Sequence, residues 1–195
     1  MDIERLVTHL SVPVPEDVQV DGDVMQAAVA AILRPSPARS GYDLLFIRRA
    51  EHDRDPWSGH MAFPGGRVDP EDTGPQAAAV REVMEEVGID LMAHGRLLGR
   101  LAQVASPPLR SRVVVTPYVW VLSRDVPTKL DPREVAGVHW FSLDRWIDGE
   151  GRGTFDYRFR GRQIPLPRVD LDGQRVWGMT LKVVDDLLTC VRRAT

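Results

Sequence analysis

The segment from Pro75 to Val87 constrains this chain most, because it separates into two faces when plotted at about 3.6 residues per turn. The apolar face spans roughly 120° and consists of Ala77, Val80, Val83, Met84 and Val87. On the opposite side, Glu82, Glu85 and Glu86 stand at relative positions i, i+3 and i+4. The pattern predicts an amphipathic helix that packs through one face and carries a dense negative patch on the other.

The negative patch requires a partner, because like charges four residues apart destabilise an isolated helix by about 0.2–0.5 kcal/mol per pair. No lysine or arginine follows any of the three glutamates by one helical turn. A hard divalent cation such as Mg²⁺ prefers oxygen ligands and keeps positions open for water and phosphate. The residues alone leave a second reading open, in which the acidic face is simply solvated.

A glycine-rich bend precedes this helix. Pro64, Gly65 and Gly66 interrupt a short strand expected over His60–Phe63. Glycine permits positive φ and a close approach of the backbone to a ligand, as a metal and phosphate site requires. The bend and the helix together therefore predict one site.

The spacing of these residues resembles the Nudix box, the signature of the Nudix hydrolases. Gly66 and Asp72 lead to R-E-V-M-E-E-V-G-I from Arg81 to Ile89, and this second half matches the box at every specified position. The first half has aspartate where glutamate is usual and one extra residue before Arg81. The resemblance implies an α/β/α sandwich with a mixed sheet, and the Mg²⁺- or Mn²⁺-dependent hydrolysis of a diphosphate linked to another moiety.

The resemblance also implies roles for single residues. Glu82 and Glu86 are the first-choice metal ligands, Glu85 shares their cluster, and all three are the expected catalytic residues. Gly66 is expected to lend a backbone carbonyl to the metal, and Gly65 and Gly66 to approach the substrate.

Two further residues near the box receive expectations. Arg81 is expected to pair with a loop carboxylate such as Asp72 or Glu71 rather than with substrate. The general base is not fixed by the box, and Glu134 in a downstream loop is a candidate, with a solvated surface residue as the alternative.

The residues before the bend suggest a substrate. Arg48, Arg54 and the run G-x3-F-P-G-G from Gly59 to Gly66 resemble the extra motif of coenzyme A pyrophosphatases in this family, although Phe46 replaces a threonine and the interval after Arg48 is longer. Guanidinium groups bind phosphate bidentately, so Arg48 and Arg54 are expected to contact the substrate. Coenzyme A or a short acyl derivative is the first expectation. A nucleoside diphosphate sugar such as ADP-ribose is the second, and a non-catalytic nucleotide-binding regulator is the third.

Composition fits one globular domain over residues 1–195, with 43% hydrophobic and 27% charged residues. A net charge of −3 gives no sign of a dedicated nucleic-acid binder, and Cys190 has no partner for an internal disulfide. No stretch is long and apolar enough for a membrane span, so we expect a cytoplasmic protein without membrane partners. A homodimer is left open.

The remaining elements follow from periodicity and turn residues. We expect a short helix carrying Ile3, Leu6 and Leu10. Strands are expected at Met25–Leu33, Tyr42–Arg48, Arg96–Val104, Val113–Leu122 and Glu134–Trp140, then a short helix at Leu143–Ile147, a hairpin at Phe155–Leu166 and a helix at Trp177–Val191. Pro117 suggests that its strand has an edge or bulge position.

Overall fold

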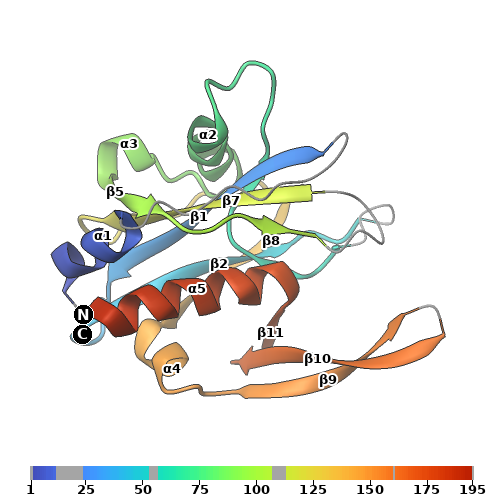
Figure 1. Cartoon of the computed structure of the whole chain (residues 1–195). Helices are drawn as coiled ribbons and strands as arrows, with labels where there is room; N and C mark the ends of the chain where they lie inside the picture. The colour runs from blue at the N-terminus through green and yellow to red at the C-terminus, as the bar shows by residue number, and fades with distance from the viewer. Residues whose placement is uncertain (1, 12–23, 53–56, 107–112, 160, 195) are drawn as a thin grey trace.

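The computed structural model describes residues 2–11, 24–52, 57–106, 113–159 and 161–194, which form two sheets and five helices (Figure 1). The helices are α1 (Ile3–Ser11), α2 (Pro75–Val87), α3 (Leu91–His94), α4 (Leu143–Ile147) and α5 (Gly178–Ala194). The larger sheet contains β1 (Met25–Pro35), β2 (Tyr42–Arg49), β3 (Met61–Ala62), β4 (Gly65–Arg67), β5 (Gly95–Arg100), β6 (Val104–Ala105), β7 (Val113–Leu122) and β8 (Val135–Ser142). The smaller sheet contains β9 (Arg152–Phe159), β10 (Arg162–Leu171) and β11 (Gln174–Trp177).

Strand β1 organises the larger sheet. It pairs in parallel with β7 along one side. On its other side, β4 pairs through Ala28 and Gly66, and β2 pairs farther along through Leu33 and Leu44, both antiparallel. The sheet is therefore mixed, and the glycines of β4 are held directly against β1.

Helices cover both faces of this sheet, which explains the continuous apolar run in β2. Leu44 and Phe46 point into a core shared with α1 and α5, whereas Leu45 and Ile47 point into a core shared with α2. Figure 1 shows α2 and α3 on one side of the sheet and α1 and α5 on the other. The expected α/β/α sandwich is confirmed. Among the described helices, none has both the length and the apolar character needed to span a membrane.

The prediction of one strand over Arg96–Val104 is wrong in detail. A helical turn, α3, precedes it, because the Asp90 side chain accepts a 2.9 Å hydrogen bond from the Ala93 N–H and caps the turn. The strand itself is divided into β5 and β6, which pair with β7 one after the other.

Pro117 does not mark an edge strand, because β7 is paired on both sides. It lies between the last pair of β5, Arg100 with Tyr118, and the pair of Val104 with Val115 in β6. The carbonyl of Pro117 accepts a 2.9 Å hydrogen bond from the Leu101 N–H in this gap. A proline is accommodated here because the neighbouring ladder is interrupted where it stands.

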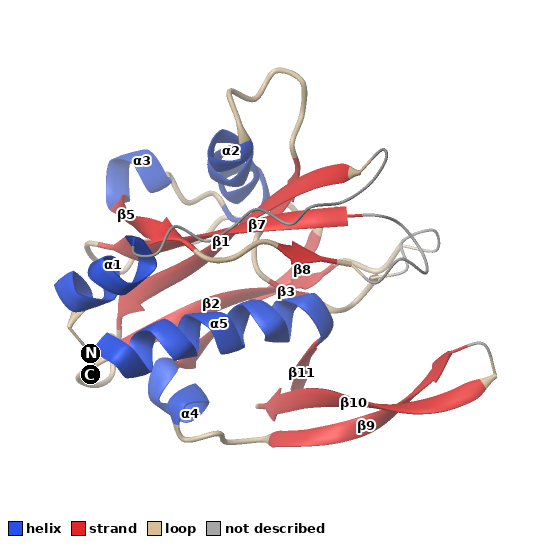
Figure 2. Ribbon diagram, in the orientation of Figure 1, coloured by secondary structure: helices blue, strands red, loops and turns tan. Residues whose placement is uncertain are grey.

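The smaller sheet extends the expected hairpin around Gly161. Strands β9 and β10 pair antiparallel, and a turn at Asp172 and Gly173, both with positive φ, leads into β11. Trp177 is the last residue of β11, so the prediction that the final helix begins at Trp177 is wrong by one residue. The face of α5 that packs against the sheet includes the buried residues Leu181, Val184, Leu187 and Leu188. Figure 2 shows the β9–β10 hairpin reaching beyond the larger sheet.

Candidate active site

Helix α2 has the bounds that the sequence predicts. Pro75 stands in its first turn, and Gly88 ends it with φ of 68° and an N–H that bonds to the Met84 carbonyl. The expected faces are rotated, however, because Met84 is 51% exposed whereas Glu86 is only 2% exposed. Glu86 shares the sheet-facing stripe with Val83 and Val87, so a carboxylate enters the side of the helix that was expected to be apolar.

Three carboxylates lie close together near the C-terminal end of α2, where Glu86 is buried. One carboxylate oxygen each from Glu82, Glu86 and Glu134 lie within 4.8 Å of one another. Glu82 is half-buried, Glu86 buried and Glu134 exposed. We call these residues the three-carboxylate group.

Glu134 lies 48 residues after Glu86 in the sequence, and backbone hydrogen bonds hold its loop against the helix. The N–H groups of Lys129 and Asp131 donate to the carbonyls of Val87 and Glu86 at 2.8 and 3.1 Å. The Ala50 N–H, just after β2, donates to the Glu134 carbonyl at 2.8 Å. The loop is thereby fixed to the helix end on one side and to β2 on the other.

Glu85 lies outside the three-carboxylate group. Its side chain is 53% exposed, and its Oε2 accepts a 3.1 Å hydrogen bond from Arg81. The three glutamates predicted from the helix thus divide into Glu82 and Glu86, which face Glu134, and Glu85, which faces Arg81.

Burial makes the two helix carboxyls of the group hard to ionise. The pKa of Glu86 is raised to about 8, mainly by desolvation and also by the charge of Glu82, while the Gly65 N–H and the charge of Arg49 act in the opposite direction. Desolvation also raises the pKa of Glu82, against the hydrogen bond from Arg81. A divalent cation would favour the ionised form of both groups, and oxygen donors are the ligands that Mg²⁺ and Mn²⁺ prefer.

The glycines of β4 give the group its space. A Cβ on Gly66 would lie 2.3 Å from Oε1 of Glu82, and a Cβ on Gly65 would lie 2.2 Å from the Ala28 carbonyl oxygen. Gly65 also has φ of 145° and donates its N–H to Oε2 of Glu86 at 2.8 Å. The backbone therefore approaches both carboxylates as closely as glycine allows, and the donor set fits a divalent ion.

Arg81 anchors the loop before α2, as the sequence predicts. Its Nε and Nη2 donate to the two carboxylate oxygens of Asp72 at 3.2 and 3.0 Å. Its Nη1 donates to Glu82 at 3.0 Å, and its Nη2 also reaches the Arg67 carbonyl at 3.1 Å. These contacts raise the pKa of Arg81 and keep its charge beside the group.

Of the two arginines predicted to contact the substrate, the structure describes Arg48. Arg48 is an exposed residue of β2, and it lines a cavity together with Met61, whose side chain belongs to the core on the α5 side. Its neighbour Arg49 acts electrostatically on Glu86 instead. Alternation along a strand explains the difference and could have identified Arg49 from the sequence. Arg54 lies outside the described residues.

Comparisons with known proteins agree with this geometry. A family model described as "NUDIX domain" matches residues 24–158. The chain is 32% identical over 182 residues to "Uncharacterized Nudix hydrolase NudL" from Yersinia pestis (strain Pestoides F), covering 92% of this chain and 88% of the relative.

Two solved structures show the same fold. A MutT/nudix family protein from Enterococcus faecalis aligns with a TM-score of 0.59 and 17% identity, over 91% of this chain and 64% of that one. A C. elegans Ap4A hydrolase binary complex aligns with a TM-score of 0.53 and 21% identity, over 64% of this chain and 85% of that one. The family match over residues 24–158 and the identity with NudL show that this chain belongs to the Nudix hydrolase family and is a pyrophosphohydrolase.

Proposed function

We propose that this Nudix hydrolase cleaves the diphosphate of coenzyme A or a short acyl-coenzyme A, giving 3′,5′-ADP and (acyl-)4′-phosphopantetheine. The observation that carries the proposal is the three-carboxylate group, whose oxygens lie within 4.8 Å of one another. Nudix hydrolases use divalent metal ions on small-molecule diphosphates, and we propose Mg²⁺ or Mn²⁺ here.

Glu82 and Glu86 would hold the ion, with a backbone carbonyl from the Gly66 region. When bound, a divalent ion neutralises the diphosphate and lowers the pKa of a coordinated water. The surrounding residues position its ligands. The Gly65 N–H fixes one oxygen of Glu86, and Arg81 fixes one oxygen of Glu82. Each carboxylate has a second oxygen that would bind the ion, and these two hydrogen bonds set the direction of that oxygen.

Glu134 would serve as the general base. It is the exposed member of the group, so it can exchange a proton with solvent after each turnover. Water attacks one phosphorus atom, its proton passes to the Glu134 carboxylate, and the bridging P–O bond breaks. The bridging oxygen leaves with the electron pair as part of the second phosphomonoester.

The choice of coenzyme A rests on the resemblance upstream of the helix. The G-x3-F-P-G-G run that follows Arg48 ends in Gly65 and Gly66, and the Gly65 N–H donates a hydrogen bond to Glu86. The same run begins at Gly59, which together with Arg48 lines a cavity. One short segment thus connects a surface cavity with the three-carboxylate group, as a long substrate with a central diphosphate requires.

A panel of diphosphates tests the proposal. Coenzyme A, acetyl-coenzyme A, ADP-ribose and a diadenosine polyphosphate are incubated with Mg²⁺ or Mn²⁺ and with EDTA, and phosphomonoester products are separated by chromatography. We expect the highest kcat/KM for the coenzyme A compounds and no turnover in EDTA. Ready cleavage of ADP-ribose without cleavage of coenzyme A would remove the substrate assignment and leave the family assignment intact.

A further inference from the structure

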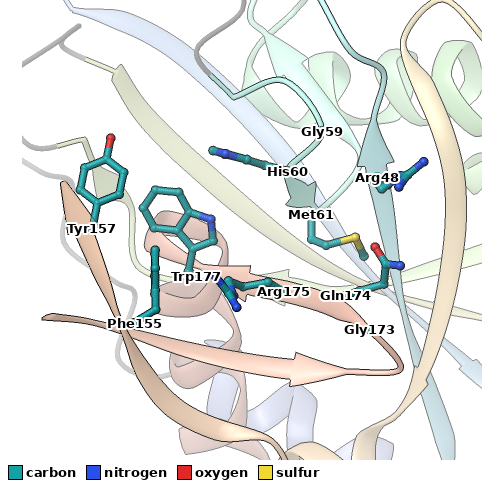
Figure 3. A pocket seen from close by; sticks show the side chains of 10 residues that line it. All are labelled: Arg48, Gly59, His60, Met61, Phe155, Tyr157, Gly173, Gln174, Arg175 and Trp177. Carbon is teal, nitrogen blue, oxygen red and sulfur yellow. The ribbon is translucent and has the colours of Figure 1, made fainter. Parts of the chain in front are cut away.

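A cavity lies between the end of β2, strand β3 and the smaller sheet (Figure 3). Its volume is about 460 Å³, within the range of about 300–1,000 Å³ usual for small-molecule sites. Arg48 and Met61 line it from the larger sheet, and Trp177 lines it from β11. Arg49, which acts on Glu86, is the next residue after Arg48 on the strand. The cavity and the three-carboxylate group therefore lie on opposite faces of the same strand end.

Aromatic side chains form one end of this cavity, around Trp177 (Figure 3). The Trp177 ring centroid lies 5.3 Å from those of both Phe155 and Tyr157, and 5.1 Å from that of His60. All four side chains are half-buried, so their rings are held in place and are still partly accessible. Rigid, partly exposed aromatic rings are typical of a surface that stacks on a planar base.

Cationic and amide side chains also line the cavity, beside Met61. Arg48 is exposed, and Figure 3 shows it with Gln174 and Met61 on the side away from Tyr157 and Phe155. The Arg175 guanidinium stands 5.0 Å over the Phe155 ring and is also paired with Asp170 at 3.1 Å. Arg175 thus has a carboxylate partner, which leaves Arg48 as the better placed group for a phosphate.

We propose that this cavity binds the adenine nucleotide half of the substrate, with the base stacked on the Trp177 cluster and the ribose phosphate beside Arg48. The inference rests on the proposed function, because it assigns one half of a coenzyme A compound to a place in the fold. The pantetheine half is a flexible chain of amides and methylenes without a planar ring, and it does not match a cavity with aromatic rings at one end and a guanidinium at the other.

The fold provides a route between the two sites. Strand β3 pairs with the end of β2 through Met61 and Ala62, and the chain then continues into β4, which pairs with β1. A nucleotide in the cavity extends its 5′-diphosphate past the ends of β2 and β3 toward Gly65, three residues after Ala62. The diphosphate then reaches the three-carboxylate group from the side of the glycine bend.

Isothermal titration calorimetry of metal-free protein with 3′,5′-ADP tests the inference. We expect saturable binding, and about tenfold or greater weakening in Trp177→Ala, from the usual effect of losing one aromatic ring beneath a base. Trp177→Phe keeps a ring and should retain most of the affinity, which also guards against a folding defect in the alanine variant. Arg48→Ala should weaken 3′,5′-ADP more than 5′-AMP. Arg158→Ala removes an exposed arginine of β9 that does not line the cavity, and it should bind like wild type.

The outcomes separate this inference from the proposed function, because binding is measured without metal and without turnover. If 3′,5′-ADP binds in a Trp177-dependent way while coenzyme A is not hydrolysed, the cavity assignment stands and the activity assignment falls. If coenzyme A is hydrolysed while Trp177→Ala and Trp177→Phe bind 3′,5′-ADP as tightly as wild type, the cavity assignment is overturned. Binding of 4′-phosphopantetheine in place of 3′,5′-ADP would also overturn it.

Discussion

The Gly65 N–H donates a 2.8 Å hydrogen bond to Oε2 of Glu86, and this bond joins the glycine bend to the buried carboxylate of helix α2. Gly65 and Glu86 are 21 residues apart in sequence. Gly65 also pairs with Val29 of β1, so its hydrogen bond holds the Glu86 carboxylate in a fixed position relative to the centre of the larger sheet. The position of Glu86 therefore depends on backbone contacts that a side chain at Gly65 would break.

Alanine substitutions at Gly65 and Gly66 should differ in their effects, the first lowering mainly stability and the second mainly activity. Gly65→Ala would place a Cβ 2.2 Å from a backbone oxygen at φ of 145°, and we expect a loss of more than about 2 kcal/mol in unfolding free energy. Gly66→Ala would meet only side-chain atoms of Glu82, which can shift more easily than backbone, so we expect stability within about 1 kcal/mol of wild type and kcat/KM lower by about a hundredfold. Urea denaturation and steady-state kinetics measure both effects. Equal loss of stability in the two variants would contradict this account.

Glu86→Gln should stabilise the metal-free protein at alkaline pH. The pKa of Glu86 is raised from 4.5 to about 8 in the fold, so the folded protein binds more protons than the unfolded chain between these values. The buried group therefore does not destabilise the protein below pH 4.5, and its cost is complete only above pH 8. We expect the Tm difference between Glu86→Gln and wild type in EDTA to grow across this window.

Added Mg²⁺ should reverse that order, because only wild type has a charged ligand to offer at this position. Glu85→Gln is the matched control, since Glu85 is 53% exposed and lies outside the three-carboxylate group. If Glu86→Gln were less stable than wild type in EDTA at pH 9, the claim that the buried Glu86 charge destabilises the metal-free protein would be contradicted.

Asp72→Asn should lower stability at neutral pH and lose that effect in acid. The hydrogen bond from Arg81 lowers the pKa of Asp72 below its usual 3.8, so its stabilising contribution is present above pH 3.8 and disappears as pH falls through the lowered value. Denaturation midpoints at several pH values measure this narrowing difference. Asp69→Asn is a useful comparison, because Asp69 is 56% exposed and 3.6 Å from Arg81. If the difference in denaturation midpoint between Asp72→Asn and wild type stayed constant down to pH 2, the charge of Asp72 would not be the source of its stabilising effect.

Local signals account for the parts of the structure that the sequence predicts well. Pro75 and Gly88 set the ends of α2, and the pairing of Arg81 with Asp72 follows from their nearness in the loop and helix. The turn at Asp172 and Gly173 is a hairpin signal that could have revealed β11 and placed Trp177 in a strand.

Tertiary contacts explain what the sequence does not reveal. Nothing local brings Glu134 to Glu82 and Glu86, because its loop is placed by backbone bonds to the end of α2 and to β2. The rotation that buries Glu86 and exposes Met84 depends on how the helix settles on the sheet. Hydrophobicity alone would give Met84 the buried position.

Glu134→Gln should reduce kcat by about 10²- to 10⁴-fold, the usual effect of losing a general base. The affinity for Mg²⁺, measured by titration calorimetry, should change by less than about threefold, since Glu82 and Glu86 remain. Similar losses in kcat and in Mg²⁺ affinity would instead make Glu134 a metal ligand.

The release of 3′,5′-ADP from coenzyme A tests the central claim most directly, measured with Mg²⁺ for wild type and Glu82→Gln. Glu71→Gln, which changes an exposed carboxylate of the preceding loop, serves as the control for charge. We predict turnover by wild type and Glu71→Gln, and a rate lower by orders of magnitude in Glu82→Gln, because one of the two ligands is lost. Release of 3′,5′-ADP at the wild-type rate by Glu82→Gln would contradict the claim that the three-carboxylate group is the catalytic site.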